Sequence, residues 1–432
     1  MFDTIIRNAN LPDGRSGMDI GIDKGRITAI DRGLPAEAGE VIDASGRLVS
    51  PAFCDPHFHM DATLSLGMPR MNVSGTLLEG IGLWGELRPL LTREAVVERA
   101  LKYCDLAVSQ GLLFIRSHVD TSDSKLVTVE GLLEVREKVA PYIDLQLVAF
   151  PQDGYYRSPQ GVKALERALD MGVEIVGGIP HFERTMDEGR QSVEALCRIA
   201  ADRGLMVDMH CDETDDPMSR HIETLSAETV RHGLQGRVAG SHLTSMHSMD
   251  NYYVSKLIPL MAEAEINVIA NPLINIMLQG RHDTYPKRRG MTRVRELMEA
   301  GLNVSFGQDC CMDPWYSMGS ADMTEVAHMA IHVGQLGSII DKHEVFDAIT
   351  VNSAKTMGLA DYGIGVGCRA DLVVLQAENV TEALRLKPGR LFVLKSGKVI
   401  SKTAPRIAEL ALDGRPQSID PGKDFVPGAA KA

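Results

Sequence analysis

The sequence predicts an α/β protein, a TIM-like (β/α)₈ barrel with a small β-sandwich built from both chain ends. Eight short apolar runs alternate with amphipathic stretches through the middle of the chain, and both ends carry short strand-like segments. At 432 residues the chain is also too long for one compact core of typical size. We therefore expect three segments: residues 1–50 as the first part of the sandwich, 51–364 as the barrel, and 365–432 as the rest of the sandwich and a tail.

The eight runs are apolar over most of their length, as strands buried on both faces of a parallel sheet should be. They cover residues 48–58, 111–118, 143–150, 173–179, 205–210, 237–242, 266–271 and 302–309. Between them, apolar residues recur at three- and four-residue spacing, which predicts amphipathic helices. The clearest of these helices cover residues 94–108, 162–169, 192–201, 222–231 and 344–357.

The two chain ends show a different pattern, with short strands separated by turns that contain glycine. The expected strands are residues 4–8, 19–22 and 26–30 before the barrel, and 371–375, 390–395 and 398–401 after it. Neither end has enough apolar residues for a core of its own. We therefore expect both ends to pack together beside the barrel.

Composition excludes several classes of function. A net charge of −13 without a basic stripe argues against binding a nucleic-acid polymer, because phosphate contacts supply most of that affinity. No apolar run is long enough to span a bilayer, and the N-terminus shows no signal-peptide organisation. The seven cysteines are scattered, as in a protein with reduced thiols. We expect a cytoplasmic enzyme that acts on a small molecule.

Residue types that bind metals stand at the ends of three expected strands. His57 and His59 end the first, where period-two alternation places both imidazoles on one side of the chain. His210 ends the fifth strand and Asp309 the eighth, and in this fold the carboxyl ends of the strands form the active site. Three histidines and a carboxylate are a ligand set for one catalytic divalent ion per subunit, Zn²⁺ or Fe²⁺.

Two further residues near the expected ion are candidates for proton handling. Glu213 follows His210 by three residues, close enough to take a proton from a water whose pKa the ion lowers to about 7. His242 ends the sixth strand and, together with Asp309, is placed to orient that water, with Asp309 as both ligand and transient proton acceptor. The structural alternatives are a helix-start carboxylate at Glu213 and a hydrogen-bonded core histidine at His242.

Together these motifs resemble the amidohydrolase superfamily, and within it the cytosine deaminase branch, over essentially the whole chain. The residues that carry the resemblance are His57-Phe58-His59-Met60-Asp61, Phe150-Pro151-Gln152, Ile179-Pro180-His181-Phe182-Glu183, His210-Cys211-Asp212-Glu213, Ser241-His242, Met246-His247-Ser248 and Asp313-Pro314-Trp315-Tyr316.

The resemblance implies that the three histidines and Asp309 hold one ion. It also implies that Gln152 binds the amide-like edge of a pyrimidine ring, that Glu213 protonates a ring nitrogen, and that His242 contacts the attacking water. Trp315 would form part of the pocket wall. Residues 173–179 contain no lysine, which resembles the mononuclear members of the superfamily.

One position departs from the cytosine deaminase pattern. Where that branch typically reads Gly-His-Asp-Asp, this chain reads Gly307-Gln308-Asp309-Cys310, so a cysteine follows the metal aspartate. In the family the second carboxylate lies near carbon 5 of the ring. A thiol there leaves room for a methyl group, whose burial contributes about 0.8 kcal/mol. Neutral variation of a lining residue is the alternative for Cys310.

The expected function is therefore hydrolytic deamination of a free cytosine-type base, cytosine or 5-methylcytosine, by metal-activated hydroxide, in a homo-oligomer. The alternative enzyme keeps this site and acts on another N-heterocycle, of the isoguanine, creatinine, pterin or triazine type. A barrel that only binds a ligand is a third possibility. Glu213 argues against it, because binding alone does not need a proton-transferring carboxylate.

Overall fold

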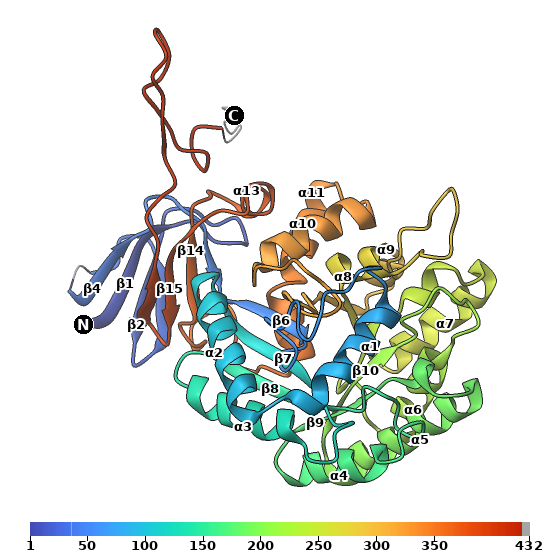
Figure 1. Cartoon of the computed structure of the whole chain (residues 1–432). Helices are drawn as coiled ribbons and strands as arrows, with labels where there is room; N and C mark the ends of the chain where they lie inside the picture. The colour runs from blue at the N-terminus through green and yellow to red at the C-terminus, as the bar shows by residue number, and fades with distance from the viewer. Residues whose placement is uncertain (36, 426–432) are drawn as a thin grey trace.

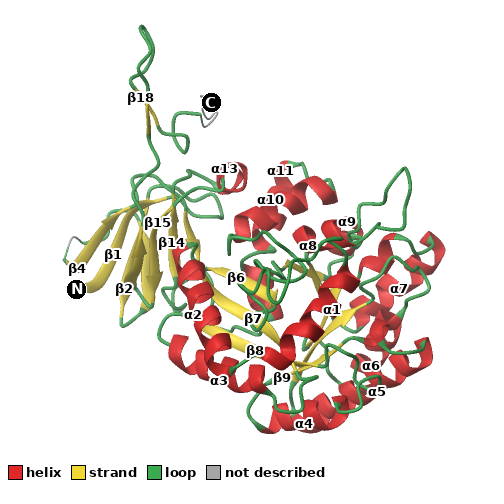
Figure 2. Cartoon of the chain, in the orientation of Figure 1, coloured by secondary structure: helices red, strands yellow, loops and turns green. Residues whose placement is uncertain are grey.

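Eight parallel strands form the centre of the larger body in the computed structural model, which describes residues 1–35 and 37–425 (Figures 1 and 2). Their order in the sheet follows their order in the chain, and a parallel bridge between Phe58 and Asp309 closes the sheet on itself. The strands are β6 (Phe53–Phe58), β7 (Leu112–Asp120), β8 (Asp144–Phe150), β9 (Ile175–Gly178), β10 (Met206–Cys211), β11 (Val238–His242), β12 (Asn267–Ala270) and β13 (Asn303–Phe306). The predicted (β/α)₈ barrel is confirmed.

Most of the helices connect these strands and cover the outside of the barrel (Figure 2), and the last four follow the eighth barrel strand in the chain. In order they are α1 (Leu77–Leu87), α2 (Arg93–Ser109), α3 (Val127–Val139), α4 (Gly161–Asp170), α5 (Met186–Arg203), α6 (His221–His232), α7 (Asn251–Glu263), α8 (Pro272–Leu278), α9 (Val294–Glu299), α10 (Met323–Gly334), α11 (Ile339–Asp347), α12 (Val351–Thr356) and α13 (Val380–Leu386). In α2, for example, Val96, Ala100, Tyr103 and Ala107 are buried at three- and four-residue spacing, so one face packs against the barrel.

Both chain ends form the smaller body, which lies beside the barrel (Figure 1). One sheet has the order β3-β2-β1-β4 and the other β16-β15-β14-β5. The strands are β1 (Phe2–Ala9), β2 (Met18–Asp23), β3 (Arg26–Asp31), β4 (Ala38–Asp43), β5 (Val49–Pro51), β14 (Leu372–Leu375), β15 (Arg390–Lys395) and β16 (Lys398–Lys402). Ile6 and Ile20 share an apolar core with Leu372 and Leu394, so the two ends pack together, as predicted.

Beyond β16 the chain leaves the body of the protein and runs outward (Figure 1). This segment contains a short antiparallel pair, β17 (Ala408–Glu409) and β18 (Ser418–Ile419). Across the described residues, no helix has both the length and the apolar character needed to span a membrane.

The structure corrects three predictions. Residues 48–58 are not one strand: the chain passes from β5 in the small sheet to β6 in the barrel at Ala52, since an apolar run suits either sheet. The predicted helix 344–357 is two helices, because Thr350 leaves the helical conformation, with φ −132° and ψ −98°. Strand β4 was not predicted, since Ala38 and Gly39 have low β propensity.

Candidate active site and metal centre

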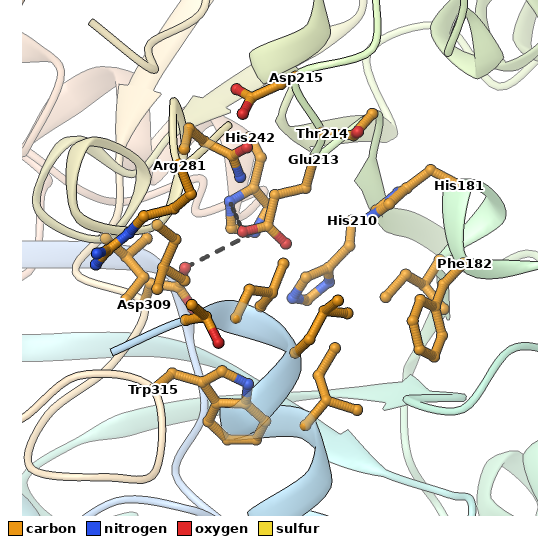
Figure 3. A pocket seen from close by; sticks show the side chains of 18 of the residues that line it. His181, Phe182, His210, Glu213, Thr214, Asp215, His242, Arg281, Asp309 and Trp315 are labelled. Atoms are coloured by element: carbon orange, nitrogen blue, oxygen red, sulfur yellow. Dashed lines mark ion pairs between the residues drawn. The ribbon is translucent and has the colours of Figure 1, made fainter. Parts of the chain in front are cut away.

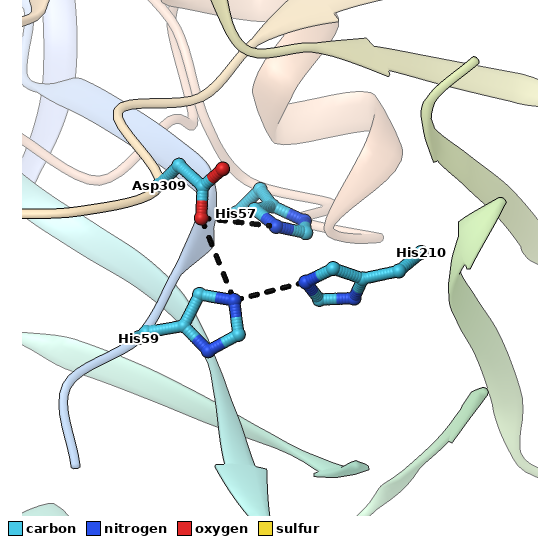
Figure 4. A group of neighbouring side chains, drawn as sticks. All are labelled: His57, His59, His210 and Asp309. Atoms are coloured by element: carbon cyan, nitrogen blue, oxygen red, sulfur yellow. Dashed lines mark hydrogen bonds and ion pairs between the residues drawn. The ribbon is translucent and has the colours of Figure 1, made fainter. Parts of the chain in front are cut away.

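Four side chains converge at the carboxyl ends of three barrel strands (Figure 4). His57 lies near the end of β6 and His59 directly after it. His210 lies near the end of β10, and Asp309 lies in the segment that follows β13. All four are buried, and one potential ligand atom from each lies within 4.8 Å of the others. The four residues predicted as metal ligands therefore form one group.

The spacing of the four donor atoms fits a single ion. Asp309 Oδ1 lies 3.6 Å from His57 Nε2 and 3.4 Å from His59 Nε2, and His59 Nε2 lies 2.9 Å from His210 Nε2. Donors about 2.1 Å from a tetrahedral ion stand about 3.4 Å apart. His57 Nε2 is buried and has no hydrogen-bond partner among the described residues. An ion would satisfy it.

Burial keeps the imidazoles of His59 and His210 in the neutral form that binds metals. It lowers the pKa of His59 to about 4 and holds the pKa of His210 well below the ordinary value. For Asp309, burial alone would raise the pKa, but the adjacent His57 and His242 lower it below the ordinary value. The group therefore presents the neutral nitrogens of His59 and His210 beside the carboxylate of Asp309.

A fourth histidine contacts the group through His57. His118, near the end of β7, places its Nε2 3.1 Å from His57 Nδ1 and 3.7 Å from Asp208 Oδ1. Contacts of this kind orient metal-binding imidazoles. Sequence reasoning did not single out His118, although it ends an expected strand and the same strand-end rule would have found it.

The two residues predicted to handle protons lie beside this group. His242 places Nε2 3.7 Å from Asp309 Oδ2, and its Nδ1 lies 3.5 Å from Glu213 Oε1. Burial raises the pKa of Glu213 well above its ordinary value, and the negative charge of Asp309 raises it further. A carboxyl group in this state can carry a proton near neutral pH.

Two of these residues have unusual backbone conformations. His242 has φ 70° and Asp309 has φ 69°, both in the left-handed region that residues other than glycine seldom adopt. Conformations of this kind cluster at functional sites, where the surrounding structure maintains them. Both residues stand at strand ends that face the cavity.

His59, His210 and Asp309 of this group line a cavity of about 510 Å³ (Figure 3). Its wall includes Gln152, Cys310 and Trp315, the three residues predicted to bind substrate. It also includes residues that sequence reasoning did not select, among them Leu77, Leu78 and Ile81 of α1, Ile274 and Leu278 of α8, and Arg281 and His282 at the rim. Nothing in the sequence marks these residues, because their place follows from how the connecting segments fold over the barrel.

Cys310, which follows Asp309 in the chain, faces the same cavity. Cys310 Sγ lies 3.6 Å from Asp309 Oδ1. Burial raises the pKa of the Cys310 thiol well above its ordinary value, and the charge of Asp309 raises it further. The wall is therefore neutral at the position where the related pattern has a second carboxylate.

Residues 40–403 match the amidohydrolase family. The chain belongs to this family. It is therefore a metal-dependent hydrolase of C–N bonds, and the buried group of three histidines and Asp309 is a set of donors in the described structure that suits such an ion.

Three relatives resemble the chain over almost its whole length. The N-isopropylammelide isopropyl amidohydrolase of Pseudomonas sp. (strain ADP) is 31% identical over 93% of this chain and 98% of that protein. The pterin deaminase of Rhizobium rhizogenes is 30% identical over 87% of this chain and 85% of that protein. The crystal structure of 5-methylcytosine deaminase from Klebsiella pneumoniae liganded with 5-fluorocytosine is 42% identical, covers 93% of this chain and 98% of that one, and has a TM-score of 0.90.

Removal of one ligand should abolish metal binding. We expect the purified protein to hold about one divalent ion per chain and His59→Asn to hold almost none, because the substitution removes the imidazole nitrogen that lies 2.9 Å from His210 Nε2 and 3.4 Å from Asp309 Oδ1, and imidazole is a donor that these ions prefer. Elemental analysis by mass spectrometry measures the content. His181→Asn is the control, since His181 lines the cavity but lies outside the ligand group. Equal metal content in both variants would contradict the assignment of His59.

The position of the Trp315 indole depends on a glycine in α1, the helix that contributes Leu77, Leu78 and Ile81 to the cavity wall. A Cβ on Gly80 of α1 would stand 2.4 Å from Trp315 Cδ1, so Gly80→Ala must displace the indole. We expect a changed tryptophan emission spectrum, which only Trp84 and Trp315 produce, and a loss of roughly 10- to 100-fold in kcat/KM. Gly82→Ala is the matched control, since its Cβ has open space in the same helix. An unchanged spectrum in Gly80→Ala would refute this packing.

Proposed function

We propose that the protein deaminates a free cytosine-type base by hydrolysis, with 5-methylcytosine as the preferred substrate. Water would add to carbon 4 of the ring, the exocyclic C–N bond would break, and ammonia would leave, so that 5-methylcytosine gives thymine. The observation that carries the proposal is the neutral Cys310 thiol in the cavity wall beside Asp309. The 42% identity to 5-methylcytosine deaminase of Klebsiella pneumoniae supports it.

We assign the ion to His57, His59, His210 and Asp309, and favour Zn²⁺ or Fe²⁺, which accept nitrogen and carboxylate ligands. When bound, such an ion makes hydroxide available near neutral pH. We infer one ion per subunit of a cytoplasmic homo-oligomer. The metal content and the size of the particle in solution are both measurable on the purified protein.

Gln152 and Glu213 would orient and protonate the ring. The carboxamide of Gln152 can donate and accept hydrogen bonds at once, which matches the adjacent N–H and C=O of a lactam edge. Glu213 lies in the same cavity wall and, with its raised pKa, can pass a proton to a ring nitrogen. Protonation of that nitrogen would make carbon 4 more electrophilic and so open to attack by water.

The preference for a methyl group follows from charge and volume at Cys310. A carboxylate at this position would stand beside Asp309 in a buried wall, where desolvation against an apolar methyl group is unfavourable. The thiol is smaller and uncharged, so a methyl group on carbon 5 can pack against it. Trp315 lines the same cavity and offers a flat face for the ring.

Another N-heterocycle, of the isoguanine, creatinine, pterin or triazine type, is the second candidate, because the names of two relatives refer to other rings, a pterin and an ammelide. The cavity of about 510 Å³ also lies within the range of about 300–1,000 Å³ typical of drug-sized ligands. Gln152 and Glu213 would serve any N–C=N edge equally well. The outer cavity wall, rather than these polar residues, would discriminate between the two candidates.

An ammonia-release assay on the metal-loaded protein separates these functions. We expect turnover of 5-methylcytosine and cytosine, and far slower turnover of isoguanine, pterin, creatinine and N-isopropylammelide. Amine release from the ammelide is followed separately by chromatography, since its leaving group is not ammonia. Turnover of the pterin or the ammelide alone would establish the second candidate instead.

Glu213→Gln tests the proton-transfer role. We expect kcat to fall by about 10²- to 10⁴-fold, because the amide keeps the shape but cannot carry the proton. The metal content should stay unchanged, since Glu213 is outside the ligand group. Normal turnover with normal metal content would rule out this role for Glu213.

Cys310→Asp tests the basis of selectivity. We expect the ratio of kcat/KM for 5-methylcytosine to kcat/KM for cytosine to fall by about fourfold or more, which corresponds to the loss of one methyl burial site of about 0.8 kcal/mol. Cys311→Ser is the control, because Cys311 is buried outside the cavity wall and should leave the ratio unchanged. A constant ratio in Cys310→Asp would be inconsistent with the proposal.

A further inference from the structure

Helix α8 contributes an asparagine to the environment of His242. Asn275 Nδ2 lies 2.9 Å from His242 Nδ1, the shortest contact recorded for that nitrogen, and both side chains are buried. On the other side of the ring, His242 Nε2 faces Asp309 Oδ2 at 3.7 Å. One ring nitrogen therefore meets α8 and the other meets the metal aspartate.

The orientation of the Asn275 amide is determined by its other contact. Asn275 Oδ1 accepts a hydrogen bond of 3.2 Å from the backbone N–H of Asn271. A backbone N–H can only donate, so the oxygen must face Asn271 and the NH₂ group must face the imidazole. The reverse orientation would leave the buried N–H of Asn271 without an acceptor.

We propose that Asn275 is a positioning residue that holds His242 in the neutral tautomer with its proton on Nε2. A proton on Nδ1 would set two donors against each other across 2.9 Å. Glu213 Oε1 is the competing partner of Nδ1, but at 3.5 Å it lies beyond the Asn275 contact. Asn271 Nδ2 lies 3.3 and 3.4 Å from the two ring nitrogens and so favours neither.

This tautomer determines whether His242 donates or accepts a hydrogen bond at Nε2. Its consequence for catalysis rests on the proposed function. With its proton on Nε2, His242 donates a hydrogen bond toward Asp309 and toward an attacking oxygen beside it. It cannot also accept a proton at that nitrogen. Proton transfer is therefore left to the carboxyl groups of Glu213 and Asp309, which line the same cavity.

Nitrogen-15 NMR of the zinc-loaded protein, labelled at histidine side chains, reads the tautomer directly. His242→Gln assigns the resonances. In the wild-type protein we expect Nδ1 without a proton and Nε2 with one, in the absence of any substrate. A protonated Nδ1 would overturn the proposal. Because no turnover is measured, this result is independent of whether the proposed substrate is correct.

Asn275→Asp is the decisive variant. A carboxylate keeps the acceptor for the Asn271 N–H but presents an acceptor, not a donor, to His242, so we expect the proton to appear on Nδ1. For the substrate identified by the ammonia assay, kcat should fall at least tenfold while KM changes less than twofold. An unchanged tautomer, or a moved proton with wild-type kcat, would overturn the role of Asn275.

Asn251→Asp is the charge-matched control. Asn251 is exposed at the start of α7, so the same substitution there should leave the His242 resonances and kcat unchanged. An equal shift of the His242 resonances in this control would assign the effect to net charge, and the positioning role would be rejected.

Discussion

Two backbone hydrogen bonds close the barrel, and both join residues of the metal group. The N–H of Asp309 donates to the carbonyl of His57, and the N–H of His59 donates to the carbonyl of Asp309, each at 2.9 Å. A shift of one residue in this register would turn the side chains to opposite faces. Barrel closure and the geometry of three of the four proposed ligands therefore depend on the same contacts. The left-handed backbone of Asp309 is part of this arrangement.

Burial then determines the chemical state of the groups that this closure brings together. The imidazoles of His59 and His210 are held neutral, so they can bind an ion rather than repel it. The same low-dielectric surroundings raise the pKa of Glu213. One physical cause thus favours metal binding at one side of the cavity and proton transfer at the other.

The ion and its ligands do not by themselves select a substrate. Metal-dependent hydrolysis belongs to the family as a whole, whereas the relatives named above act on different rings. We place the choice of ring in the wall of the cavity, at Cys310 and Trp315. Asn275 acts on a different property, the direction of the hydrogen bond that His242 donates. We therefore propose that specificity and catalytic orientation depend on separate residues.

The sequence by itself determined the eight strands and the place of the metal group, because apolar runs mark buried strands and strand ends of a (β/α)₈ barrel meet on one face. It did not determine the passage between sheets at Ala52, since the same apolar pattern suits either sheet. The division at residues 51 and 364 stays a prediction. The contacts of His118 and Asn275 were decided only by the tertiary structure, because each meets its partner histidine from another strand or helix.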